Sequence, residues 1–106
     1  MDIEVTTDGT AAVVRVSGEL DAHRCDVLAA ALGEVLDGGI SDLVIDAAGL
    51  AFIDSSGIST FLDARERVTA GGGTFVLRDP TPAVRRVVEI TGLVEALGVE
   101  PPEAAT

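Results

Sequence analysis

The sequence predicts an α/β fold in which a mixed, mostly parallel sheet of four to five strands packs against three or more helices. Short runs rich in Val, Leu and Ile alternate with segments of helical periodicity, and glycines stand between them. The repeating order of strand and helix requires parallel pairing through right-handed crossovers. The 106 residues suffice for one domain. We place it at residues 1–99 and expect an untethered tail at residues 100–106.

The first predicted element is an antiparallel hairpin. Residues 3–7 (IEVTT) and 10–18 (TAAVVRVSG) flank Asp8 and Gly9, a dipeptide that readily supplies the positive φ angles of a tight turn. The second strand is apolar at nearly every position, so we expect it to be buried on both faces. The first strand then lies at one side of the sheet.

Helices and strands alternate along the following residues. Apolar residues recur at helical spacing over residues 27–36, and a glycine pair follows where a C-cap favours glycine. Residues 43–45 (LVI) are too short for a buried helix and predict a central strand. A loop then leads to a second helical face, which starts at Ile58 and ends at the three glycines of residues 71–73.

The last strand and helix precede a short apolar segment. Residues 74–77 form another apolar strand, and Thr81 followed by Pro82 is typical of a helix cap and a first helical residue. A valine stripe follows, and Gly92 ends this third helix. Residues 93–99 then lead into the expected tail.

Composition excludes several classes of function. There are 18 acidic residues against 7 basic ones, all arginine, which gives a formal net charge of −11. Nucleic acids and anionic membranes attract clustered cations, so we expect neither as a partner. The N-terminus lacks a signal-peptide pattern and no apolar run is long enough to span a bilayer, so we expect a cytoplasmic protein. One Cys and one His are too few for a disulfide or a zinc site, and we expect no metal or cofactor.

The stretch AFIDSSGIS, residues 51–59, places two adjacent serines where a helix is expected to begin. Ser and Asp side chains accept hydrogen bonds from the free N–H groups of a first helical turn, so capping explains their presence simply. The serines also follow the carboxyl end of a central parallel strand, where open α/β sheets usually engage ligands and partners. A phosphorylation switch is therefore the alternative to a purely structural role.

Phosphorylation of one of these serines is compatible with the predicted fold. A phosphoserine carries about −1.5 to −2 charges, and at a helix N-terminus it meets free N–H groups and the favourable end of the helix dipole. Repulsion from Asp54 opposes this, but the solvent screens it. We therefore expect the phosphate to act at a binding surface, where an unmatched charge costs about 2 to 5 kcal/mol.

Enzymatic interpretations of the sequence lack the required residues. A serine nucleophile needs a base, and the chain offers only His23 and no Lys, with Asp54 where a nucleophile elbow requires glycine. The glycines at 71–73 close a helix instead of opening one, so they predict no phosphate cradle. Glu19 and Asp21 are two acids among many and predict a solvated loop. We expect a protein that is not an enzyme.

Three motifs resemble the anti-sigma factor antagonists of the STAS domain family. They are GELD at residues 18–21, DAAGLAFIDSSGI at residues 46–58 and GGGTFVLRDPTPAVRRVVEITGL at residues 71–93. The likeness covers about residues 3–97, with the motifs in the order and spacing of the family. The resemblance implies a single STAS-like domain. Many members continue into a further C-terminal helix, whereas this chain offers only VEALGVE and then residues 101–106.

The resemblance also implies a function and a set of site residues. In that family a partner that is both serine kinase and anti-sigma factor phosphorylates the second serine of DSSG, which is Ser56 in this chain. Ser55 is then a neighbouring cap, Gly57 lets the backbone of the partner approach, and Asp21 lies near the phosphorylated serine. The implied partner-binding residues are Asp21, Asp54, Ser55, Ser56, Gly57 and Ile58, with a core role also open for Ile58.

The implied mechanism is partner switching. The unphosphorylated protein binds the anti-sigma factor kinase and releases a sigma factor. Phosphorylation with ATP carried by the kinase dissolves the complex, and a separate phosphatase restores it. Two alternatives stay open: a STAS interaction module of another signalling assembly, and a small-ligand or nucleotide-binding domain that uses the same helix start.

Overall fold

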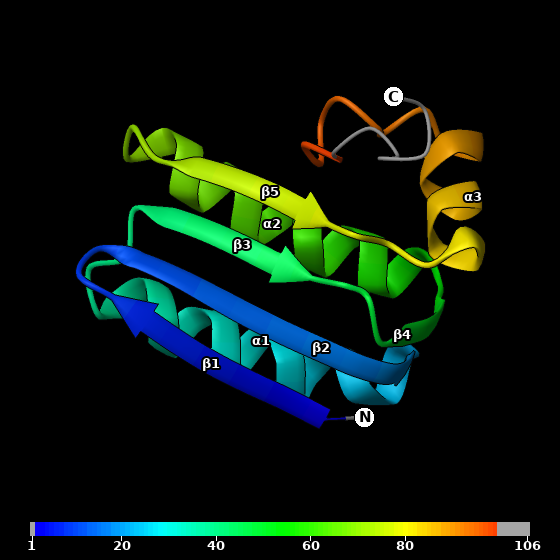
Figure 1. Cartoon of the computed structure of the whole chain (residues 1–106), viewed down its shortest axis with the longest axis horizontal. Coiled ribbons are helices and arrows are strands. Elements are labelled where there is room, and N and C mark those ends of the chain that lie inside the picture. The colour runs from blue at the N-terminus through cyan, green and yellow to red at the C-terminus, as the bar shows by residue number, and fades with distance from the viewer. Residues whose placement is uncertain (1, 100–106) are drawn as a thin grey trace.

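The computed structural model describes residues 2–99 and contains a five-stranded mixed sheet with three helices (Figure 1). The strands β1 (Asp2–Asp8) and β2 (Ala11–Leu20) form the predicted antiparallel hairpin. Their turn consists of Gly9 and Thr10, and Gly9 has a φ of +62°, which glycine adopts at no steric cost. The prediction of a hairpin with its first strand at the side of the sheet is confirmed.

The other strands pair in parallel. β3 (Asp42–Asp46) pairs with β2, and β5 (Thr74–Arg78) pairs with β3, so the sheet order is β1-β2-β3-β5. β4 (Leu50–Ile53) pairs with the last part of β2, and the register shifts between Gly18 and Glu19. The expectation of a plain loop between residues 45 and 55 is therefore wrong. A four-residue strand is too short to show a period in the sequence.

Two of the helices cover one face of the sheet. α1 (Ala22–Asp37) and α2 (Ser55–Ala70) lie side by side behind the strands in Figure 1. α3 (Pro82–Ile90) stands at one end, where it contacts β4. Thr81 caps α3 as predicted, and its hydroxyl also donates a hydrogen bond to the Leu50 carbonyl at 2.8 Å, which attaches the helix to β4. The prediction of a third helix packed on the sheet is confirmed, and its partner is β4.

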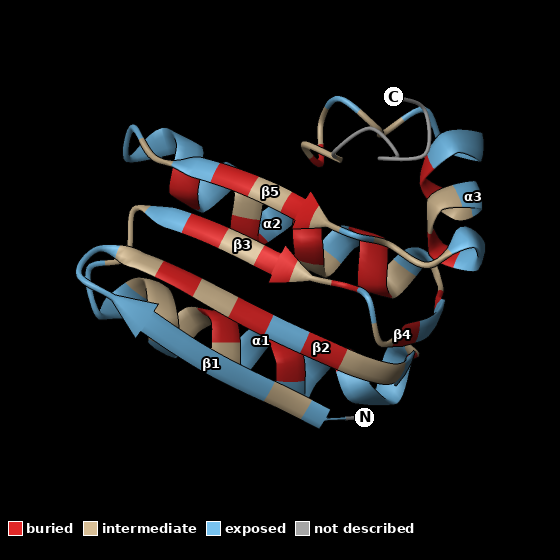
Figure 2. Cartoon of the chain, in the orientation of Figure 1, coloured by how far each residue is buried: buried red, intermediate tan, exposed pale blue. Residues whose placement is uncertain are grey.

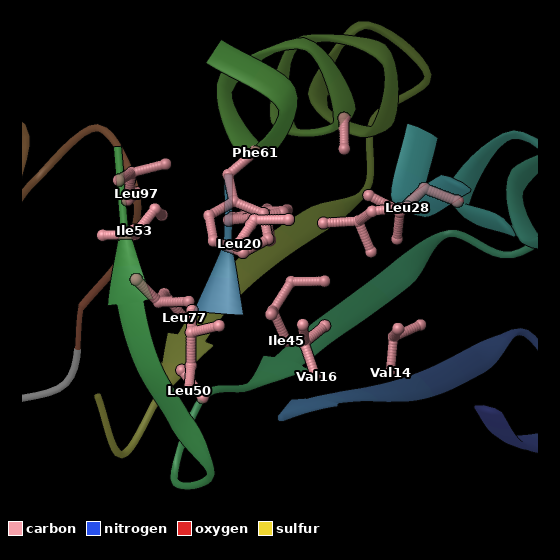
Figure 3. Close-up of a cluster of buried hydrophobic side chains, with 14 of the residues drawn as sticks. Val14, Val16, Leu20, Leu28, Ile45, Leu50, Ile53, Phe61, Leu77 and Leu97 are labelled. Carbon is pink, nitrogen blue, oxygen red and sulfur yellow. The ribbon is translucent and has the colours of Figure 1, made fainter. Parts of the chain in front are cut away.

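The core lies between the sheet and the helices α1 and α2 (Figure 3). Val14, Val16 and Ile45 point from the strands toward Phe61 of α2 and Leu28 of α1, and all five are completely buried. Burial alternates along β2, because successive side chains point to opposite faces (Figure 2). The expectation that β2 is buried on both faces is therefore wrong, since no described residue covers its second face.

The segment after α3 belongs to the folded body. Leu97 is completely buried, and its carbonyl oxygen accepts a hydrogen bond from the Leu77 backbone N–H at 3.1 Å. The expected tail at residues 100–106 lies outside the described residues. Among the helices of residues 2–99, none combines the length and the apolar character needed to cross a bilayer.

Candidate functional site

The starts of α1 and α2 lie together because two paired strands lead into them. Leu20 at the end of β2 pairs with Ile53 at the end of β4. The next residues are Asp21 and Asp54, and the Asp54 backbone N–H donates to the Leu20 carbonyl at 3.4 Å. The two helix N-termini thus open at the carboxyl ends of parallel strands, the edge of an α/β sheet where binding sites usually form.

Asp54 is the N-cap of α2. Its backbone is extended, and its Oδ1 accepts a hydrogen bond from the Gly57 N–H at 3.1 Å. This confirms the capping role that the sequence left open for Asp54. The expectation that Ser55 is a cap is wrong, because β4 continues to Ile53 and places Asp54 at the cap position. Ser55 is instead the exposed first residue of the helix.

Ser56 lies in the first turn of α2 and is partly exposed. Its carbonyl oxygen accepts a hydrogen bond from the Thr60 hydroxyl at 2.9 Å, which fixes the backbone of the turn. Within residues 2–99 its own hydroxyl has no hydrogen-bond partner. The backbone at this position is therefore fixed while the hydroxyl oxygen is left available for chemistry.

Gly57 and Ile58 lie inside the protein. A Cβ atom added to Gly57 would lie 2.6 Å from Cγ1 of Ile53 and 3.0 Å from Cδ2 of Leu20. Ile58 is only 5% exposed and joins the core. The absence of a side chain at Gly57 is therefore required by the packing of α2 onto the ends of β2 and β4.

Asp21 caps α1 in the same way that Asp54 caps α2. Its Oδ1 accepts from the Arg24 N–H at 3.1 Å, and its Oδ2 forms an ion pair with the Arg24 guanidinium at 2.8 Å. Both side chains are substantially exposed, so the pair contributes little to stability. The Arg24 guanidinium is therefore already paired within the first turn of α1.

Cys25 is a buried residue close to the starts of both helices. It is buried on α1, and burial is the main reason why the pKa of its thiol is raised. The carboxylates of Asp54, Asp21 and Asp26 raise the pKa further, and a hydrogen bond with Thr60 lowers it. Cys25 thus lies within electrostatic range of both caps and in contact with Thr60, the residue that holds the Ser56 carbonyl. The predicted role of Cys25 as a small helix-face residue is confirmed.

Sequence patterns did not single out Thr60 as a site residue. Its only signal is the spacing of four from Ser56, which allows a hydroxyl to reach a carbonyl one turn back. His23, predicted at the surface, is exposed on the first turn of α1. Among residues 2–99, no three His, Cys, Asp or Glu side chains gather in a way that could hold a metal ion.

A family model described as the STAS domain matches residues 2–105. The chain belongs to the STAS domain family. Among its relatives, this STAS domain is similar to an anti-sigma F factor antagonist of Lysinibacillus sphaericus, with 32% identity over 92 residues, 86% of this chain and 78% of the relative.

The fold of this STAS domain is similar to solved structures of the same kind. The anti-sigma factor antagonist SpoIIAA in its unphosphorylated form has a TM-score of 0.82 at 25% identity and covers 98% of this chain and 92% of its own. The structure of the Bacillus cell fate determinant SpoIIAA in the phosphorylated form has a TM-score of 0.74 at 25% identity, and the match covers 98% of this chain and 96% of that chain. The structure of an anti-sigma factor antagonist from Mycobacterium paratuberculosis has a TM-score of 0.86 at 28% identity, and the match covers 98% of this chain and 88% of that chain.

Proposed function

We propose that this STAS domain is an anti-sigma factor antagonist that binds an anti-sigma factor serine kinase and is switched off by phosphorylation of Ser56. The observation that carries the proposal is the Ser56 hydroxyl, partly exposed and without a hydrogen-bond partner among residues 2–99, in the first turn of a capped helix. Its relatives and structural neighbours named as anti-sigma factor antagonists support the same assignment.

The helix start tolerates a phosphate at Ser56. The first turn of α2 presents backbone N–H groups, of which Asp54 occupies the one on Gly57. A phosphoserine in this turn is favoured by the remaining N–H groups and by the helix dipole. The Asp54 carboxylate opposes it across solvent, which screens the repulsion. The fold should therefore survive the modification.

The interface should not survive it. At the neighbouring starts of α1 and α2, Asp21 and Asp54 are each already used as a helix cap, and the Arg24 charge is paired with Asp21. A phosphate buried there by a partner would have no free cation of this group to pair with. Such unmatched charges cost about 2 to 5 kcal/mol, which corresponds to roughly 30- to several-thousand-fold in affinity.

The remaining site residues divide between contact and support. Ser55 and Ser56 offer side-chain atoms to a partner, and Asp21 and Asp54 border them. Gly57 and Ile58 act from within, by holding the first turn of α2 against β2 and β4. In this scheme the kinase brings ATP, and a serine phosphatase removes the phosphate and restores binding.

Direct nucleotide binding is less well supported. Of two grooves in the described part of the chain, one of about 150 Å³ lies between α1 and α2, and one of about 290 Å³ lies where these helices end. They share Leu36 and Arg67, and Ser55 and Ser56 line neither of them. Backbone resonances near Ser56 should accordingly show no saturable shift on titration with ATP alone.

A phosphorylation assay tests the proposal. The protein is incubated with ATP, Mg²⁺ and candidate anti-sigma factor kinases from the same genome, and the phosphate is mapped by mass spectrometry. We expect one phosphate on Ser56, none on Ser56→Ala, and continued modification of Ser55→Ala. Calorimetry should then show binding of a kinase to the unmodified form only. A phosphate on another residue, or equal binding of both forms, would contradict the proposal.

A further inference from the structure

The face of the sheet opposite α1 and α2 has no cover among residues 2–99. In Figure 1 the strands β1, β2 and β3 lie in front of the helices, and no described segment crosses in front of them. The strand registers align the outward residues of β1, β2, β3 and β5 in three rows of four. The rows are Glu4–Arg15–Asp46–Arg78, Thr6–Val13–Val44–Val76 and Asp8–Ala11–Asp42–Thr74. We call these twelve residues the open face.

The open face combines an apolar centre with charges of alternating sign. Val13, Val44 and Val76 are partly exposed in the middle row. In the first row the sign alternates from Glu4 to Arg78 across the four strands, and the Arg78 guanidinium lies 3.3 Å from the Asp46 carboxylate. A surface of this kind can be complementary to itself if the order of the charges is reversed across the contact.

We propose that the open face docks a second copy of this chain about a two-fold axis that runs parallel to the strands between β2 and β3. This rotation keeps each residue at its height along the strand and reverses the order of the strands. Arg15 then faces Asp46 of the second copy, and Glu4 faces Arg78. In the middle row Val13 faces Val44. Two twisted sheets that stack in this way settle about 30° from alignment, so the central facing pairs carry most of the contact.

The third row fits the same arrangement. Asp8 faces Thr74 of the second copy, and Asp42 faces Ala11, so no acid meets an acid. A two-fold axis across the strands, centred on the valines, would instead bring Glu4 against Asp8 and Asp46 against Asp42. Like charges in contact are strongly unfavourable, so the charge pattern selects one orientation.

The contact is small and the dimer is accordingly weak. Four strands of five residues span roughly 17 Å by 19 Å, or about 300 Å² in projection, against about 800 Å² per partner in a stable interface. The net charge of −11 per chain also opposes association. The open face points away from α2, so Ser56 stays accessible in both copies and the inference is independent of the proposed function.

Sedimentation equilibrium tests the dimer without any kinase. The protein is measured from about 10 µM to 1 mM at about 0.15 M salt, where repulsion is screened beyond about 8 Å. We expect the average mass to rise toward that of a dimer. Arg15→Glu should raise the dissociation constant at least about tenfold, because it sets an acid against Asp46. Arg86→Glu, the same charge change on the exposed surface of α3, should leave it unaltered.

Mixing two variants separates the contact between chains from effects within one chain. Arg15→Glu and Asp46→Arg should each be monomeric alone, whereas their mixture restores both facing pairs and should dimerise. Circular dichroism establishes that each variant is folded. A wild-type protein that stays monomeric to about 1 mM, equal effects of Arg15→Glu and Arg86→Glu, or a folded mixture that stays monomeric would each overturn the proposal. If Asp46→Arg does not fold, the comparison of the two arginine variants decides.

Discussion

Asp21 and Asp54 cap neighbouring helices because each directly follows one residue of a strand pair. Leu20 and Ile53 are in register in β2 and β4, and both chains turn into a helix at the next residue. Both carboxylates lie close enough to Cys25 to raise the pKa of its thiol. The start of α2 thus already holds a carboxylate that the helix N-terminus stabilises. A further negative charge on Ser55 or Ser56 would lie on the solvent side of this cap.

Replacing Ser56 should separate binding from folding. Ser56→Asp adds a charge in the first turn of α2, where the helix dipole favours it, so we expect a melting temperature within a few degrees of the wild type. Its affinity for the kinase partner should fall by roughly tenfold or more, because the carboxylate is desolvated without a cation. Calorimetric titration and thermal unfolding measure the two effects. Ala30→Asp, the same charge change on the exposed surface of α1, is the control and should bind normally.

Asp54 variants should distinguish the cap from its charge. Asp54→Ala removes the acceptor for the Gly57 N–H and should cost about 1 kcal/mol, or roughly 4 to 8 °C in melting temperature. Asp54→Asn keeps an oxygen at the same place and should retain most of that stability. A loss of partner binding in Asp54→Asn, without a loss of stability, would assign the charge itself to recognition. Equal melting of the alanine and wild-type proteins would contradict the capping role.

Alanine substitutions at Gly57 and Gly33 form a matched pair of helix variants. A methyl group at Gly57 would press on Ile53 at 2.6 Å, so Gly57→Ala should destabilise the protein by about 1 to 3 kcal/mol. Nothing lies within 4 Å of a Cβ at Gly33 in α1, and Gly33→Ala should stabilise it by about 0.5 to 1 kcal/mol. Urea denaturation of both variants measures this opposition. Two changes of the same sign would show that helix propensity outweighs packing at Gly57.

Cys25 should react only when the protein opens. Its side chain is buried and its pKa is raised by burial, so at about pH 8 the native protein should be alkylated by iodoacetamide far more slowly than the unfolded chain. Because the pKa is raised in the fold, the folded state holds the proton more tightly than the unfolded chain. The contribution of Cys25 to stability is therefore complete below the ordinary pKa of 9.0 and is lost as the pH rises through the folded value. Equal labelling rates in the native and unfolded states would contradict this.

The sequence predicts those elements whose signals are local. The hairpin at Gly9 and the helix that ends at Gly38 depend on residues close in the chain, and both are confirmed. β4 could not be predicted, because its four residues form a strand only by pairing with the end of β2. The same pairing decides that Asp54, and not Ser55, caps the next helix.

The site could be predicted in part for the same reason. The motif singles out Ser56, and the structure places it in the first turn of α2 with a hydroxyl that has no hydrogen-bond partner among residues 2–99. The buried position of Gly57 and the contact of Cys25 with Thr60 depend on residues far apart in the chain. No pattern along the sequence reports such distances, so these contacts required the three-dimensional arrangement.

The segment that ends at Val99 also shields a rim of the sheet. Leu97 accepts the Leu77 N–H, and Gly98 runs so close to β5 that a Cβ there would lie 2.6 Å from the Phe75 carbonyl oxygen. A chain that ended at Thr91 would leave the outer edge of β5 uncovered and would leave a cavity where the Leu97 side chain packs. Exposed edge strands pair with other chains, so light scattering should show that the shortened protein aggregates and does not stay a soluble monomer.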